Sequence, residues 1–201
     1  MEIQSCLKMT KMCQILWVLS LLLCPRASFG QDEKNLFRAE AGIAFCGSGD
    51  MYGKVFSLAY MHRVYRDLFI SPDFEVAGFK QIVQPNSTIS AISYSGSIVL
   101  AYRKILSERI LFETSLGSCL NQFNWTFVTS SNSMDIKGIE VEPYSQKTYK
   151  EKMGVGYLVR IGSAFRLSRS DLGLFYCLQN DTNGNIVHSL RFNITCNFGY
   201  L

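Results

Sequence analysis

The chain has 201 residues, of which 48% are hydrophobic and 18% are charged, and its formal net charge is +4. Removing Lys8, Lys11 and Arg26 from 20 basic residues and Glu2 from 16 acidic residues leaves 17 and 15 beyond residue 30, a net charge of +2. A nucleic-acid-binding protein carries clustered lysine and arginine. The composition therefore argues against a nucleic-acid partner, and the length suits one domain.

The first thirty residues differ from the rest of the chain. Lys8 and Lys11 precede an apolar run over residues 15–24, and the small residues Ser28 and Gly30 follow it. This order predicts a secretory signal peptide over residues 1–30 and a mature domain over residues 31–201. A transmembrane anchor is the weaker alternative, because a helix needs about 20 apolar residues to span a bilayer.

The mature chain alternates apolar and polar residues in eight segments, which is the period of β-strands with two different faces. No comparable stretch keeps a helical period. The predicted strands cover residues 37–45, 56–63, 68–76, 92–103, 110–117, 155–166, 172–179 and 190–200.

Short and long connections alternate between these segments. The short connections cover residues 64–67, 104–108 and 167–171. The longer connections cover residues 47–54, 79–90, 121–152 and 180–189. This alternation predicts up-and-down strands with both chain ends on the side of the short turns.

Eight up-and-down strands can close into a barrel that leaves no unpaired edge. Closure is required in lipid, where unpaired backbone groups cost several kcal/mol. A soluble barrel places its apolar face inside, whereas a membrane barrel places it outside. Aromatic residues at the two expected membrane interfaces favour the membrane alternative: Tyr94 and Tyr157 on one side, Tyr102 and Phe165 on the other.

The polar face carries charges of both signs, which also favours a membrane barrel with a polar lumen. The predicted lumen charge network consists of Arg38, Glu40, Arg63, Asp73, Glu75, Arg103, Glu113, Arg160 and Arg191. Because eight strands leave no wide channel, we interpret this network as a salt-bridged plug in preference to a conduction path. The predicted fold class is an all-β, eight-stranded antiparallel up-and-down transmembrane β-barrel.

The opening "NLFRAEAGIAFCGSGD" and the closing "LRFNITCNFGYL" resemble the small eight-stranded outer-membrane β-barrel proteins of Gram-negative bacteria, in particular the outer membrane protein β-barrel domain group of Bacteroidetes. The resemblance implies an outer-membrane location, contact with outer-membrane lipid and lipopolysaccharide, a monomeric state, and a last strand read by the barrel-assembly machinery. In that strand, the parity predicts lipid contact for one set of residues and a lumen position for the other. The first set is Phe192, Ile194, Phe198 and Tyr200, and the second is Arg191, Asn193 and Asn197.

Enzymes occur on this scaffold, notably those that modify lipid A, but the sequence indicates no catalytic residues. His62 and His188 are the only histidines, and neither has an evident acidic partner or correctly spaced serine. We predict a structural or surface-recognition role without catalysis or cofactor. The alternatives are a soluble lipocalin-like barrel that binds an apolar ligand and a lipid A-modifying enzyme.

The connection over residues 121–152 is the best functional candidate, since loops of more than about 15 residues are usually binding or mobile segments. Its predicted contact residues are Trp125, Lys147, Lys150 and Lys152, with the lysines placed to meet anionic lipopolysaccharide. Two strand extensions without a ligand are an equal alternative.

Four cysteines remain beyond residue 30, without the close C-x-x-C pairs of a zinc site. They are Cys46, Cys119, Cys177 and Cys196. Their alternation places Cys196 on the face opposite the other three, so we predict free, packed thiols in preference to disulfides.

Overall fold

The computed structural model describes residues 34–47, 51–84, 87–130, 135–136, 139–140, 145–167 and 170–197. The predicted signal peptide over residues 1–30, and Phe198 and Tyr200, lie outside the described residues. Ten strands are described: β1 (Asn35–Cys46), β2 (Met51–Tyr65), β3 (Leu68–Gln84), β4 (Ser87–Ser107), β5 (Ile110–Ser130), β6 (Asp135–Ile136), β7 (Ile139–Glu140), β8 (Ser145–Arg166), β9 (Ser170–Asp181) and β10 (Ile186–Asn197).

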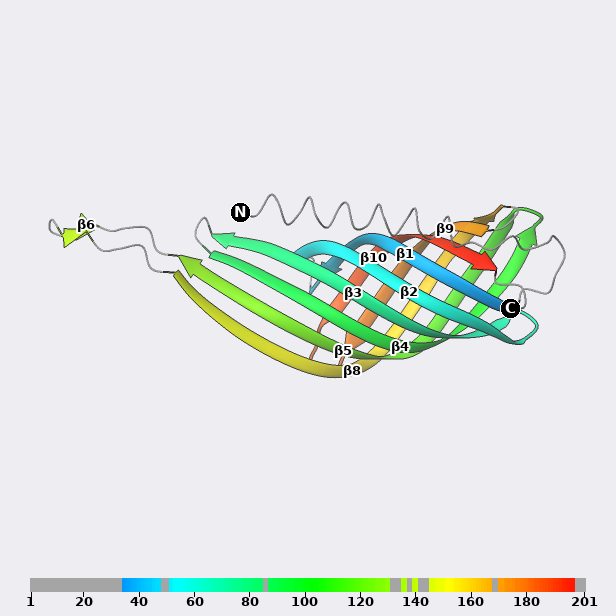
Figure 1. The fold of residues 1–201 in the computed structure, drawn as a ribbon, viewed down its shortest axis with the longest axis horizontal. Helices are drawn as coiled ribbons and strands as arrows, with labels where there is room; N and C mark the ends of the chain where they lie inside the picture. Colours follow the sequence, from blue (N-terminus) through cyan, green and yellow to red (C-terminus); the bar gives the residue numbers. More distant parts are fainter. Residues whose placement is uncertain are drawn as a thin grey trace.

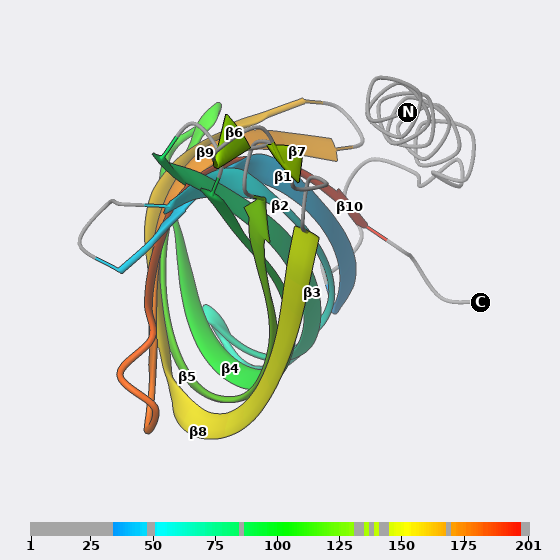
Figure 2. The same ribbon diagram turned by 90° about the vertical axis from the view of Figure 1, so that its left-hand side faces the viewer.

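Eight of these strands form one closed antiparallel barrel. Each strand pairs with the next long strand along the chain, and β10 closes the ring against β1 (Figures 1 and 2). β6 and β7 form a separate two-stranded hairpin in the connection between β5 and β8. The predicted eight-stranded up-and-down barrel is therefore confirmed. Within the described residues, no helix has the length and apolar character needed to cross a membrane.

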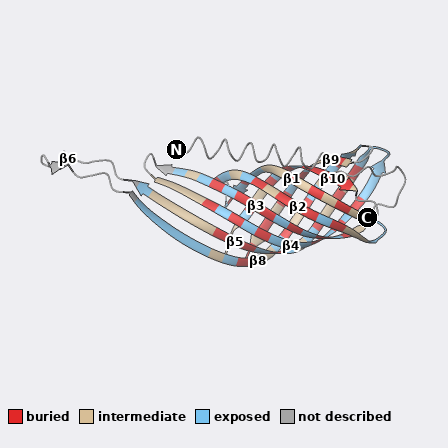
Figure 3. Cartoon of the chain, in the orientation of Figure 1, coloured by how far each residue is buried: buried red, intermediate tan, exposed pale blue. Residues whose placement is uncertain are grey.

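The barrel directs its apolar face outward and its polar face inward. Leu116 is 62% exposed and Phe192 is 68% exposed on the outside, whereas Arg191 is 0% exposed inside. Buried residues consequently alternate with more exposed ones along much of the barrel wall (Figure 3). Ile194 lies on the outward face with Phe192 but is only 7% exposed, so the structure does not present it for lipid contact as predicted.

The predicted long connections are the main error of the sequence interpretation, because most of their residues continue the strands. β3 and β4 leave only residues 85–86 between them, and β5 pairs with β8 as far as Ser130 opposite Ser145. Backbone pairing satisfies the N–H and C=O groups of these residues without requiring an alternating apolar face.

Four neighbouring strands rise beyond the rest of the barrel. β2 pairs with β3 only as far as Lys80, and β9 pairs with β8 only from Gly156. The part of the sheet beyond these limits is visible where β3, β4, β5 and β8 extend past their neighbours in Figure 1. We call it the protruding sheet, and it consists of residues 81–84, 87–90, 120–130 and 145–155.

Candidate functional site

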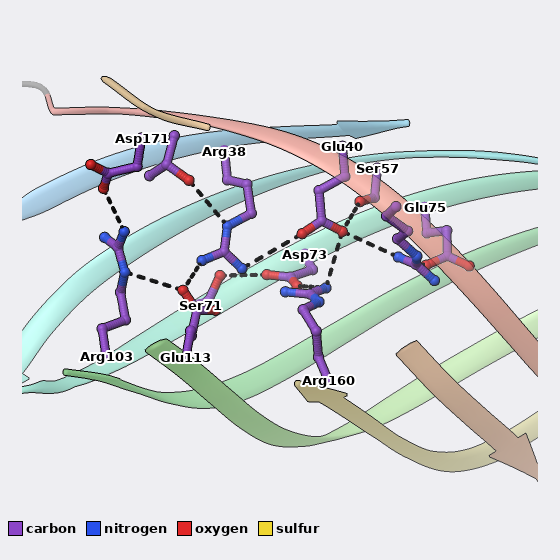
Figure 4. Close-up of polar contacts among 12 residues, drawn as sticks. Arg38, Glu40, Ser57, Ser71, Asp73, Glu75, Arg103, Glu113, Arg160 and Asp171 are labelled. Atoms are coloured by element: carbon purple, nitrogen blue, oxygen red, sulfur yellow. Dashed lines mark hydrogen bonds and ion pairs between the residues drawn. The ribbon is translucent and has the colours of Figure 1, made fainter. Parts of the chain in front are cut away.

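Eight of the nine charged residues predicted for the lumen form a connected set of ion pairs in the structure (Figure 4). Their side chains point inward because residues separated by two along a strand share a face. All eight are buried: Arg38, Glu40, Asp73, Glu75, Arg103, Glu113, Arg160 and Arg191. Arg63 is partly exposed, and its guanidinium carbon lies 5.5 Å from the centre of the Phe69 ring.

Glu40 lies at the centre of this network. Its Oε2 atom is 3.3 Å from Nη1 of Arg191 and 3.6 Å from Nη2 of Arg160, while its Oε1 atom is 3.6 Å from Nη1 of Arg38. Ser57 donates a hydrogen bond of 2.9 Å to the same carboxylate. One carboxylate thus contacts cations from three strands, which compensates part of the cost of burying the charges.

Further ion pairs extend the network in both directions along the lumen. Arg160 lies 2.9 Å from Asp73, and Arg191 lies 2.7 Å from Glu75. Arg38 also pairs with Glu113, whose Oε2 atom lies 3.1 Å from Nε of Arg103.

Asp171 completes the network, and sequence reasoning missed it. Its Oδ2 atom is 2.7 Å from Nη2 of Arg103, and its Oδ1 atom is 3.6 Å from Nε of Arg166. The sequence pattern assigned Asp171 to a short connection, but it pairs with Thr195 and Arg166 inside the sheet. With Asp171 and Ser57 included, all eight barrel strands contribute a side chain to the network.

Apolar residues lie on either side of the charged network, which the prediction of a polar lumen did not include. Along β1, the network residues Arg38 and Glu40 lie between Leu36 and Ala44. Leu36 belongs to a buried cluster toward the short turns, with Met61, Phe69 and Ala101. Ala44 belongs to a larger cluster toward the protruding sheet, formed by Ala44, Cys46, Met51, Val55, Ala77, Phe79, Ala91, Phe123 and Val187. The lumen is therefore filled by a charged layer between two apolar layers.

An aromatic row connects the larger apolar cluster to the protruding sheet. The ring centroids of Phe79 and Phe123 are 6.4 Å apart, those of Phe123 and Trp125 are 5.9 Å apart, and those of Trp125 and Phe127 are 6.4 Å apart. Phe123 is buried, whereas Trp125 and Phe127 are partly exposed. The row therefore begins in the filled lumen and continues onto the inner face of the protruding sheet.

The structure places the predicted contact residues on β5 and β8 of the protruding sheet. Trp125 pairs with Lys150, and Phe123 pairs with Lys152, so these lysines share the inner face with the aromatic row. Lys147 has the opposite parity and lies on the outer face. All three lysines belong to one strand, but they do not form one patch.

Neither histidine is part of a catalytic arrangement in the described residues. Nδ1 of His62 lies 2.8 Å from Oδ1 of Asn35, and Nδ1 of His188 lies 2.5 Å from the hydroxyl of Tyr176. Ser189 follows His188 directly and therefore faces the lumen, on the other side of the sheet. The described ranges also contain no group of three or more metal-ligating side chains.

Cys46, Cys119 and Cys177 are free thiols buried on the inner face. The prediction of free cysteines is wrong for Cys196, which is disulfide-bonded. Its parity separates it from the three free thiols, so a partner could not be assigned from the strand pattern.

Comparison with known proteins shows the fold. No family model matches the sequence, and no curated protein is similar to it at a significant level. Neisserial surface protein A is 17% identical with a TM-score of 0.51, and the match covers 84% of this chain and 99% of that one. Ail, the attachment invasion locus protein of Yersinia pestis, in complex with the heparin analogue sucrose octasulfate, is 12% identical with a TM-score of 0.50, covering 82% and 99%. The outer-membrane enzyme PagL matches with a TM-score of 0.39 and 9% identity, covering 80% and 99%. The chain thus has the eight-stranded barrel fold that is found in outer-membrane proteins.

Proposed function

We propose that the chain is an integral outer-membrane protein, exported by its signal peptide, whose barrel holds the protruding sheet at the cell surface for recognition of a partner. The observation that carries this proposal is the combination of a filled lumen with a four-stranded sheet that continues beyond the barrel. A filled lumen offers no transport path, whereas the protruding sheet offers exposed backbone and side chains on a rigid support.

The orientation of the faces supports the membrane location over a soluble lipocalin-like barrel. A lipocalin needs an apolar cavity, but here the outward face is the apolar one and charged residues fill the centre of the barrel. Absence of catalysis is part of the proposal, supported by the surroundings of His62 and His188. Lipid, lipopolysaccharide and the barrel-assembly machinery are the expected partners of the barrel wall, and the proposed state is a monomer.

Cysteine labelling in intact cells tests the location. Tyr149→Cys lies in the protruding sheet, and Glu108→Cys lies in the turn between β4 and β5. A membrane-impermeant maleimide should label the first variant in intact cells and the second only after the outer membrane is opened. Equal labelling of both variants in intact cells would contradict the proposed orientation.

Shortening the protruding sheet tests the recognition role. Trp125 and Lys150 pair directly across β5 and β8, so a two-residue Asn-Gly turn can replace residues 126–149. The shortened chain should keep the heat-modifiable gel migration of a folded barrel. Cells that carry it should lose adhesion to an array of immobilised proteins and glycans that the full chain binds. Unchanged adhesion would place recognition elsewhere.

A further inference from the structure

Among the described residues, the strand β8 has a long unpaired edge in the protruding sheet. On one side, β8 pairs with β5 from Ser145 to Phe165 without a register shift. On the other side, it pairs with β9 only from Gly156 to Arg166. Residues 145–155 therefore lie beyond the last paired residue of β9. The corresponding free edge of β3 is much shorter, because only residues 81–84 lie beyond the pairing with β2.

The hydrogen bonds at the end of the paired region show which backbone groups face outward. Val155 accepts a 2.8 Å hydrogen bond from the Thr182 N–H and donates one of 3.3 Å to the Thr182 hydroxyl. The carbonyl of Met153 accepts a 2.7 Å bond from the Asn183 side chain. Because outward and inward backbone groups alternate along a strand, Lys147, Tyr149 and Glu151 also direct their N–H and C=O groups to this side.

The turn between β9 and β10 ends the pairing at this point. Asp181 is buried, and its Oδ1 atom accepts hydrogen bonds from the backbone N–H groups of Asn183 and Asn185. These bonds fold the chain back before it can continue beside β8. The edge is therefore left open by the turn, and in the described residues no strand covers residues 145–152 on that side.

Proteins usually protect such an edge with proline, a bulge, a short strand or lysines. Residues 145–155 contain no proline and no bulge opposite β5, but they contain Lys147, Lys150 and Lys152. The described part of the chain gives Lys150 and Lys152 no carboxylate partner. The acidic side chain between them, Glu151, has the opposite parity and accepts a hydrogen bond from Gln122.

The charges of residues 145–152 indicate which kind of strand could pair with this edge. Residues 145–152 carry three lysines and one glutamate, so a second copy of the chain would bring a segment of the same net positive charge to this edge. An acidic segment would instead place carboxylates beside the lysines on both faces. Charge complementarity thus favours an acidic partner over self-association.

We propose that residues 145–152 of β8 bind an extended acidic segment of another protein by strand addition. This inference rests on the proposed function, in which the protruding sheet recognises a partner. The partner strand would exchange backbone hydrogen bonds with Lys147, Tyr149 and Glu151, which supplies affinity. Its acidic side chains would lie beside Lys150 and Lys152 on the inner face, next to the aromatic row. The main-chain bonds select an extended conformation, and the lysines select negative charge.

The variant Tyr149→Pro tests whether binding depends on the backbone groups at the free edge of β8. The Tyr149 N–H faces outward, so proline removes a donor from the edge without removing a bond to β5. The matched control is Tyr149→Thr, which loses the ring but keeps the N–H. The probe is a labelled eight-residue peptide of alternating Glu and Thr, and its binding to the full chain in zwitterionic micelles is followed by fluorescence anisotropy.

We expect Tyr149→Pro to weaken peptide binding at least tenfold and Tyr149→Thr to change it less than about twofold. A peptide with alternate N-methylated amides should not bind. Equal binding to Tyr149→Pro and the unaltered chain, with the gel migration of both intact, would overturn strand addition. No binding of the peptide to the unaltered chain would overturn it as well. The adhesion experiment on the shortened chain tests the protruding sheet as a whole and not its edge alone. If strand addition is overturned while the shortened chain still loses adhesion, the protruding sheet recognises its partner through another face.

A charge exchange tests the acidic preference. The double variant Lys150→Glu/Lys152→Glu should bind the Glu-Thr peptide about tenfold more weakly at low salt and should gain binding of a Lys-Thr peptide. The control Lys54→Glu/Lys80→Glu changes the net charge equally on exposed positions of β2 and β3. Equal loss in both double variants would show a general charge effect and overturn selection by Lys150 and Lys152.

Discussion

Phe175 occupies a lumen position that depends on two glycines. A Cβ atom on Gly162 would lie 2.7 Å from two ring atoms of Phe175, and a Cβ atom on Gly173 would lie 2.7 Å from another. The Arg38 guanidinium carbon lies 5.2 Å from the ring centroid on the inner side. The ring is thus held between the barrel wall and the charged network.

We therefore expect Gly162→Ala to destabilise the barrel by about 1–3 kcal/mol, because the added methyl group would lie 2.3 Å from the backbone oxygen of Leu174 and 2.7 Å from the Phe175 ring, so that the neighbouring strand and the ring must move. The measurement is urea unfolding in micelles, read from the midpoint at constant slope. Gly96→Ala is the matched control, since a Cβ atom there has no neighbour within 4 Å. A midpoint as high for Gly162→Ala as for the control would contradict this packing.

Glu40→Gln removes the charge that Arg38, Arg160 and Arg191 share. Breaking a buried ion pair by changing one partner costs about 3–5 kcal/mol, because the remaining charges stay buried. The same urea experiment should show a loss of this size. Glu108→Gln, in an exposed turn, should change stability by less than about 0.5 kcal/mol. Similar losses for the two variants would contradict the central place of Glu40.

At this scale the sequence predicts which residues face the lumen but not which residues meet. Period-two alternation assigns Arg38 and Glu113 to the inner face without reference to any neighbour. Their ion pair joins β1 to β5, strands that are not adjacent in the ring. Such contacts depend on the stagger of the whole barrel, which no local pattern contains.

At the scale of elements, the phase of the apolar residues changes within β5. Leu116 and Leu120 face outward in the lower part of the strand, whereas Phe123 and Trp125 face inward in the upper part. The lower part of β5 carries its apolar side chains on the outer face, which the proposed membrane location would place against lipid. The upper part carries them on the inner face. In the sequence this phase change resembles the end of a strand, which is why residues 121–152 were predicted as a connection.

Backbone hydrogen exchange distinguishes the two sides of the β8 edge. The amides of Lys147, Tyr149 and Glu151 should exchange much faster than those of Thr148, Lys150 and Lys152, which face β5. Residue-resolved exchange by NMR in micelles provides the comparison. Uniform protection along residues 147–152 would mean that another segment already covers the edge.

At the scale of the whole molecule, the filled lumen predicts very low conductance. The charged layer and the two apolar layers leave no aqueous path of porin size. Planar-bilayer recordings of the purified chain should show no stable porin-like steps. The sequence predicted a plug from the charged residues, but it did not predict the apolar clusters, whose members include Val99 and Leu158 in the middle of strands as well as residues near the strand ends. Regular porin-sized steps would refute the filled lumen.

The charged network also crosses the seam where the two ends of the chain meet. Arg38 and Glu40 belong to β1, while Arg191 belongs to β10 and lies 3.3 Å from Glu40 across 151 positions of sequence. Until the first and last strands pair, these side chains keep their hydration, and their ion pairs gain little. Closure of the barrel and burial of this ion pair are therefore coupled, since neither is complete without the other. Opening the barrel at this seam would separate Glu40 from Arg191, so the contact between the two ends of the chain is held by ion pairs inside the lumen as well as by the backbone pairing of β1 with β10.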